Sequence, residues 1–152
     1  MSRGVTRLIT RVSFLLPTLL LLSGPAWAQD PGIRGGASVN PDQFYLGGHL
    51  ETGPLVDRIH FRPNVEAGFG NDLTLLAANM EFVYKFPTRS GWGLYAGGGP
   101  ALNIYMVNDD SNSEAGVNFL AGVEHRRGLF FEFKAGVIDS PEFKFGVGWT
   151  FR

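Results

Sequence analysis

Apolar and polar side chains alternate along most of the chain after residue 28. In the segment 143–151, for example, Phe143, Phe145 and Val147 alternate with Lys144 and Gly146. Successive side chains of a strand point to opposite faces of a sheet, so a period of two predicts strands rather than helices. We therefore expect an all-β chain.

Turn residues divide this pattern into eight expected strands, because Gly, Pro, Asn and Asp favour tight turns. The expected strands are residues 33–39, 43–52, 59–69, 73–86, 92–106, 115–125, 129–138 and 143–151. A polar loop is expected at 108–114. Pro63 and Pro100 fall inside strands on the apolar side, where proline removes a ladder hydrogen bond, so we expect a β-bulge at each.

The first 28 residues have the three parts of a secretory signal peptide. Three arginines precede an apolar stretch at 12–22, and Ala26-Trp27-Ala28 fits the small-x-small cleavage rule. The apolar stretch is too short for a transmembrane helix. We expect export, cleavage after Ala28, and one domain at 29–152.

Composition excludes several classes of protein. The chain has no cysteine, which excludes disulfide staples, cysteine-ligated zinc and a thiol nucleophile. The leader holds three of the 13 Lys and Arg and none of the 14 Asp and Glu, so residues 29–152 carry a net charge of −4. An acidic chain of this kind is not a polybasic nucleic-acid binder.

The placement of charge indicates which face of the strands lies inside a barrel. The apolar face carries no charged residue, whereas the polar face carries five acids and five bases, as a narrow interior would need because unpaired buried charges are costly. Nine glycines also fall on the polar face, where they would make room for larger inward side chains. The expected interior polar network is Arg34, Glu51, His60, Arg62, Glu66, Glu81, Lys85, Glu124, Glu132, Lys134 and Lys144.

The bulk of the apolar face favours an outward position, since an eight-stranded interior holds little more than its own side chains. Lipid can surround such rings, so we expect a transmembrane barrel. Its apolar face points outward and its polar face inward, the reverse of a soluble barrel. The expected lipid-facing residues are Phe61, Phe82, Phe131, Phe133, Phe145 and Trp149. A soluble periplasmic barrel or sandwich that binds a lipid or another apolar ligand is the alternative.

The last strand, with apolar or aromatic residues at every second position, carries the most specific resemblance. Phe143, Phe145, Val147, Trp149 and Phe151 resemble the C-terminal assembly signal of small outer-membrane β-barrels of Gram-negative bacteria, the eight-stranded OmpA/OmpX type. Arg152 departs from that pattern, which usually ends on the aromatic residue. The resemblance implies an up-and-down barrel with periplasmic termini. It also implies outer-membrane lipids, the export pathway and the assembly machinery as partners, a monomeric state, and no assigned activity.

The sequence offers little chemistry beyond this architecture. The expected outer loops carry only acids, and Asp109, Asp110 and Glu114 form a weak candidate for divalent cations, although their spacing is not that of a calcium-hand loop. No serine–histidine pairing stands out among His49, His60 and His125, so a lipid-modifying hydrolase is a third option behind a structural or surface-interaction role. No cofactor is expected, and eight strands leave no aqueous pore.

Overall fold

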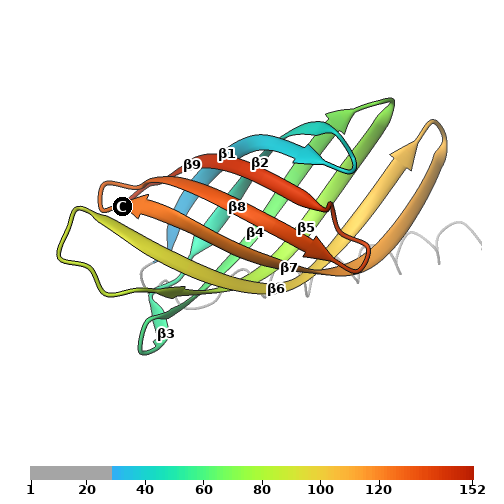
Figure 1. The fold of residues 1–152 in the computed structure, drawn as a ribbon. Helices are drawn as coiled ribbons and strands as arrows, with labels where there is room; N and C mark the ends of the chain where they lie inside the picture. Colours follow the sequence, from blue (N-terminus) through green and yellow to red (C-terminus); the bar gives the residue numbers. More distant parts are fainter. Residues whose placement is uncertain (1–28) are drawn as a thin grey trace, which may run out of the picture.

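The structure, a computed structural model, describes residues 29–152, so the expected signal peptide at 1–28 lies outside the described residues. Those residues form one closed antiparallel barrel with an up-and-down order of strands (Figure 1). The expected all-β, eight-stranded barrel is therefore confirmed. Residues 29–152 contain no apolar helix long enough to cross a membrane.

Nine strands are formed, of which eight build the barrel wall. Their bounds are β1 (Asp30–Val39), β2 (Gln43–Glu51), β3 (Pro54–Val56), β4 (Ile59–Gly70), β5 (Leu73–Lys85), β6 (Trp92–Val107), β7 (Asp110–His125), β8 (Leu129–Val137) and β9 (Phe143–Thr150). Six of the eight long strands lie within one residue of the expected bounds at each end. β1 begins three residues early, and β7 begins five residues early.

The barrel closes because each long strand pairs with two neighbours. β1 joins the ends of the chain by pairing with both β2 and β9, and β2 also pairs with β4. The register places Arg34 beside Gly47 on one side and Gly148 on the other. The register fixes which side chains share a level inside the barrel.

β3 lies between two of the expected strands, in a segment for which the sequence predicts no strand. The pairing of β2 with β4 ends at His49↔Asn64, and Pro54 and Val56 of β3 then pair with the first residues of β4. A register shift lies between Pro54 and Val56. β3 is thus a short, irregular piece on the same edge of β4, and it projects at one end of the barrel (Figure 1).

The two bulges expected at Pro63 and Pro100 are absent, so that prediction is wrong. The β4–β5 register is continuous through Pro63↔Met80, and the β6–β7 register is continuous through Pro100↔Val117. Pairing is lost near each proline, but no residue is inserted. The last β2–β4 pair involves the residue that follows Pro63. The β5–β6 pairs omit the positions around Pro100. Each proline costs ladder pairing on one side only, because a strand residue directs its N–H toward one neighbour.

The expected polar loop at 108–114 is also wrong in extent. β6 runs to Val107 and β7 starts at Asp110, so the turn is only Asn108-Asp109. Both β4–β5 and β6–β7 turns use Asn or Asp with positive φ, including Asn71, Asp72 and Asn108, which these residues tolerate better than most. Pairing of β7 with β8 ends at Val117↔Val137, so the β6–β7 hairpin extends beyond that neighbour.

The two ends of the barrel differ in charge. One end, called the acidic end, carries the turns at 40–42, 71–72, 108–109 and 138–142. The opposite end, called the arginine-rich end, carries both described termini and the turns at 52–58, 86–91 and 126–128. The turns and tail of the arginine-rich end hold Arg58, Arg89, Arg126, Arg127 and Arg152.

Candidate functional site: an ionic lumen inside an apolar wall

The wall turns its large apolar side chains outward. Phe44 is 78% exposed, and exposed apolar side chains occur on every strand. Soluble monomers rarely expose contiguous apolar patches of more than a few hundred Å², whereas here the apolar surface continues around the barrel. All six expected lipid-facing residues point outward: Phe61 is half-buried, and Phe82, Phe131, Phe133, Phe145 and Trp149 are exposed.

The lumen holds the charged side chains that the strand pattern assigned to it. Arg34, Glu51, Arg62, Glu66, Glu81, Glu132, Lys134 and Lys144 are buried, and Lys85 and Glu124 are part-buried toward the arginine-rich end. His60 lies apart from these ion pairs at the start of β4, where its Nδ1 contacts the Thr52 carbonyl oxygen at 2.8 Å. We call the ten charged residues, together with Arg152, the ionic network.

Arg62 is the centre of one half of the ionic network. Its guanidinium donates to Glu51 Oε2 at 2.7 Å and to Glu132 Oε2 at 3.1 Å. The same guanidinium lies 4.6 Å from the centre of the Tyr95 ring, and the Tyr95 hydroxyl donates to Glu132. Arg62 is therefore saturated by carboxylates and an aromatic face, as a fully buried charge requires.

Lys134 and Glu66 are the centre of the other half. Lys134 Nζ lies 3.0 Å from Glu66 Oε1 and 2.5 Å from Glu81 Oε1, and Lys144 Nζ lies 2.5 Å from Glu66 Oε2. Glu132 and Arg34 join the halves, because Glu132 Oε1 accepts from Arg34 Nη1 at 3.1 Å and the same nitrogen lies 3.5 Å from Glu66 Oε1. Five glutamates thus meet six bases in a connected set that spans the lumen.

The C-terminal Arg152 closes the arginine-rich end of the ionic network. Its Nη2 lies 2.7 Å from Glu124 Oε2 and 3.2 Å from Glu51 Oε1, and both carboxylates also pair with Lys85. The backbone brings it there because Phe151 N donates to the Pro31 carbonyl. The sequence showed Arg152 only as a departure from a terminal aromatic residue, and its pairing required the fold.

An amide belt continues the polar lumen toward the acidic end. Asn79 donates to Asn64 at 2.8 Å, Asn118 donates to Asn79 at 2.9 Å, and Asn64 donates to Glu81 at 2.9 Å. Asn103 then contacts the β8–β9 loop through the Asp139 carbonyl. The three amides from Asn64 to Asn118 are thus tied to the ionic network through Glu81, and Asn103 separately ties the wall to the β8–β9 loop.

Inward glycines receive the aromatic rings of the lumen. A Cβ at Gly146 would lie 2.3 Å from the Tyr45 hydroxyl, and one at Gly122 would lie 2.5 Å from the Tyr95 ring. A Cβ at Gly148 would lie 2.3 Å from the Phe130 ring. The sequence analysis predicted that inward glycines make room for larger side chains. It missed Phe130 as an inward residue, although Phe130, Glu132 and Lys134 occupy every second position of the same strand.

Some buried polar atoms of the lumen have no partner among the described residues. They are Arg34 Nε and Nη2, Gln43 Oε1 and His49 Nδ1. His49 Nε2 lies 3.0 Å from the Thr150 hydroxyl, and its ring packs edge-on against Phe130. This histidine–hydroxyl pair is enclosed by the wall, so lipid outside the barrel does not reach it.

The acidic candidates for a cation site do not converge. Asp109 lies in the β6–β7 turn, while Asp110 and Glu114 lie on β7, where Glu114 accepts from Asn112. Within residues 29–152, no group of three or more His, Asp or Glu side chains could hold a metal ion. The turn carries its acids on an exposed hairpin rather than around a cavity.

Comparison with solved structures places this fold among outer-membrane barrels. The chain is similar to the N-terminal β-barrel domain of Pseudomonas aeruginosa OprF, with a TM-score of 0.62 and 16% identity over 81% of this chain and 96% of that chain. It is also similar to Neisserial surface protein A (NspA), with a TM-score of 0.60 and 17% identity over 81% of this chain and 94% of that chain. No protein-family model matches the sequence, and no curated protein matches it. At these identities the likeness shows the fold alone.

Proposed function

We propose that the chain is an outer-membrane β-barrel that spans the bilayer as a monomer and has a structural or surface-interaction role. One observation carries the proposal: the charged side chains of the strands fill the lumen, and most of the large apolar side chains face outward. In water this arrangement would expose a continuous apolar surface, whereas in a bilayer it is the expected order of faces. The fold shared with OprF and NspA supports the same location.

The ionic network is proposed to close the lumen and to fix the register of the wall. Lys134 on β8 reaches Glu66 on β4, and Arg62 on β4 reaches Glu132 on β8, so each pair ties strands on different sides of the barrel. A shift of one strand by two residues would separate these charges in a poorly hydrated space. We therefore expect a rigid barrel without a steady ion conductance.

The last strand is proposed to present the assembly signal to the outer-membrane machinery. Phe143, Phe145, Val147, Trp149 and Phe151 are all exposed on the outer face of the barrel. The orientation that accompanies this role puts the arginine-rich end, with both described termini, in the periplasm. The acidic end then faces outward.

Catalysis is not part of the proposal. In the lumen the Thr150 hydroxyl lies 3.0 Å from His49 Nε2, and among residues 29–152 no carboxylate bonds to His49 Nδ1. A nucleophile needs a base that is itself oriented by a third group. Release of fatty acid from lipid vesicles by the purified protein would reinstate the hydrolase alternative.

Fractionation and gel migration test the proposed location. The expected result is recovery in the outer-membrane fraction, with folded and boiled samples that migrate differently. Recovery in the osmotic-shock supernatant as a single migrating form would instead support the soluble barrel. Planar-bilayer recordings test the closed lumen, and a steady conductance that persists in salt would contradict it.

A further inference from the structure

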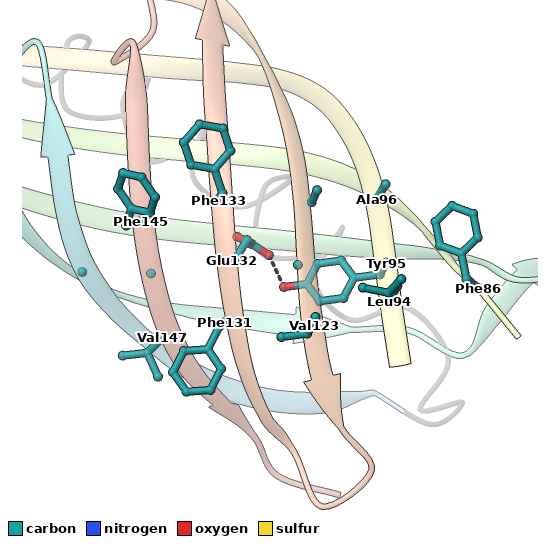
Figure 2. Close-up of a pocket in the computed structure, with 14 residues that line it drawn as sticks. Phe86, Leu94, Tyr95, Ala96, Val123, Phe131, Glu132, Phe133, Phe145 and Val147 are labelled. Atoms are coloured by element: carbon teal, nitrogen blue, oxygen red, sulfur yellow. Dashed lines mark hydrogen bonds between the residues drawn. The ribbon is translucent and has the colours of Figure 1, made fainter. Parts of the chain in front are cut away.

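A groove crosses the outer surface of the wall over β6 and β7 (Figure 2). Ala96 and Ala121, which pair directly across the two strands, form part of its floor. Phe86 lies at one edge, Phe131 and Phe133 of β8 lie beside the alanines, and the groove extends to Phe145 of β9. The groove is shallow and open toward the outside of the barrel, with a volume of about 800 Å³.

The strand register explains why the groove forms at this place. Ala96 is flanked by Tyr84 on β5, and Ala121 is flanked by Phe133 on β8. Two adjacent alanines therefore lie between aromatic side chains that are three strand spacings, or roughly 14 Å, apart. Phe119, which is 57% exposed, lies two residues from Ala121 toward the acidic end, beyond the residues that line the groove.

The opposite end of the groove leads to aromatic rings and then to positive charge. Trp92 packs edge-on against His125 at 5.0 Å and stacks on Phe131 at 6.3 Å. The next residues, Arg126 and Arg127, are exposed, and no ion pair among residues 29–152 includes either of them.

The backbone holds this arginine pair in place beside the groove. Arg126 N donates to the Gly91 carbonyl at 2.8 Å, and Arg127 N donates to His125 Nδ1 at 3.2 Å. These bonds tie the β7–β8 turn to the loop that precedes β6. The arginine pair therefore follows directly after His125, whose ring packs against Trp92.

The stretch of β7 that contains the groove and extends past it on both sides, from Phe119 to His125, matches one leaflet of a bilayer. From Phe119 to His125 the strand rises by roughly 20 Å, which is about 15 Å along the membrane normal at a strand tilt of about 40°. Half of a hydrocarbon core of about 30 Å is the same distance. A chain lying in the groove would therefore run from the interface to the bilayer midplane.

We propose that this groove is a specific site for an anionic glycerophospholipid, with one acyl chain over Ala96 and Ala121 and the headgroup phosphate at Arg126 and Arg127. The inference rests on the proposed function, because it requires the wall to face lipid. Guanidinium groups bind phosphate through paired N–H donors, and an indole at the interface packs against the region below the headgroup.

Charge favours a lipid over a second copy of the chain. Two copies in one membrane could meet through this face by a two-fold axis normal to the bilayer. Both arginine pairs would then lie at the same height in the membrane. Like charges would then face each other without a partner, which disfavours the contact. An anionic headgroup neutralises them instead.

Quenching of tryptophan fluorescence tests the site. The chain has three tryptophans, so the Trp27→Phe/Trp149→Phe variant leaves Trp92 at the groove as the reporter. The barrel would be placed in zwitterionic nanodiscs doped with phosphatidylglycerol or with phosphatidylcholine, each brominated on one acyl chain. The expected result is a preference of roughly five-fold or more for phosphatidylglycerol, since each basic residue near a membrane surface contributes about a factor of five.

Two changes should abolish the preference. Arg126→Gln/Arg127→Gln removes the phosphate partners, and Ala121→Phe fills the floor with a ring. Their controls are Arg58→Gln, at the same end of the barrel but on the β3–β4 turn, and Ala78→Phe, an exposed outward residue on β5. Both controls should keep the preference, and heat-dependent gel migration verifies that every variant is folded.

The possible outcomes separate the two proposals. Equal quenching by the two lipids, or a preference that survives Arg126→Gln/Arg127→Gln, would overturn the site and leave the membrane barrel intact. A preference lost equally in Arg58→Gln would also overturn it, because general electrostatics would then explain it. Failure of the barrel to enter nanodiscs, with no quenching by either lipid, would overturn the proposed function itself.

Discussion

The lumen of the barrel and its outer surface, turns included, use the same residue types to opposite effect. Inside, Arg62 is saturated by carboxylates and an aromatic ring, whereas Arg58 on the β3–β4 turn is exposed. Inside, Phe130 packs against His49, whereas its neighbour Phe131 points outward and stacks on Trp92. Residue type alone therefore does not determine the energetic role of a side chain in this fold.

The difference follows from what each face exchanges on folding. An inward group leaves water or the membrane interface on folding and must find hydrogen-bond partners in the protein. Its removal therefore leaves those partners unsatisfied. An outward group only exchanges one fluid environment for another. Matched substitutions on the two faces should therefore differ strongly, and the predictions below are measured as free energies of unfolding in lipid vesicles with urea.

The largest difference is expected for Arg62→Met against Arg58→Met. Removal of Arg62 leaves Glu51 and Glu132 without their shared guanidinium, and breaking a buried pair on one side costs about 3–5 kcal/mol. Arg58→Met should change stability by less than about 0.5 kcal/mol, as surface substitutions usually do. Similar values for the two variants would show that the lumen is hydrated enough to replace the guanidinium with water.

A second test asks whether the ionic network acts as pairs. Lys134→Met and Glu81→Gln each remove one charge of the buried 2.5 Å contact, so we expect each to cost about 3 kcal/mol. The double variant should cost less than the sum by about 1–3 kcal/mol, because contacting residues couple on this scale. Strict additivity in the double-mutant cycle would contradict direct pairing of the two charges.

The sequence predicted the strands and the sides on which their residues lie, because those properties are local. Alternation fixes the face of each residue once one charged position is assigned inward, and Gly, Pro, Asn and Asp fix most turns. Glu66, Glu81 and Lys134 could thus be assigned to the lumen together. The pairing of Lys134 with Glu66, 68 residues away, could not, because it depends on the stagger with which the barrel closes.

The failed predictions concern features that depend on neighbouring strands. A proline was expected to force a bulge, but Pro63 lies where β2 stops pairing, so no extra residue is needed. The stretch 108–114 looked like a polar loop, yet β6 supplies a partner for most of it and makes it strand. Ala96 and Ala121 are unremarkable in sequence, and only the register reveals them as one floor.

A third contrast concerns Gly97, which faces inward, and Gly48, which faces outward. A Cβ at Gly97 would lie 1.9 Å from the Phe82 carbonyl oxygen, whereas at Gly48 its nearest neighbour is 3.6 Å away. Gly97→Ala must push β5 and β6 apart, and overpacking of this kind costs about 1–3 kcal/mol. Gly48→Ala should be neutral within about 0.5 kcal/mol, and a comparable loss there would contradict the close-approach explanation.

The smallest contrast is expected within the amide belt. Asn79→Ala leaves the Asn64 carbonyl oxygen and the Asn118 amide without their partner, and unsatisfied buried groups cost about 1–3 kcal/mol. We expect the lower half of that range, because these groups are neutral and water entering from the acidic end can reach them more easily than it reaches Arg62. Asn112→Ala, on the exposed hairpin, should have no measurable effect. A loss at Asn79 as large as that at Arg62 would mean that the lumen is equally dry along its whole length, and the distinction between an ionic centre and a softer amide belt would fail.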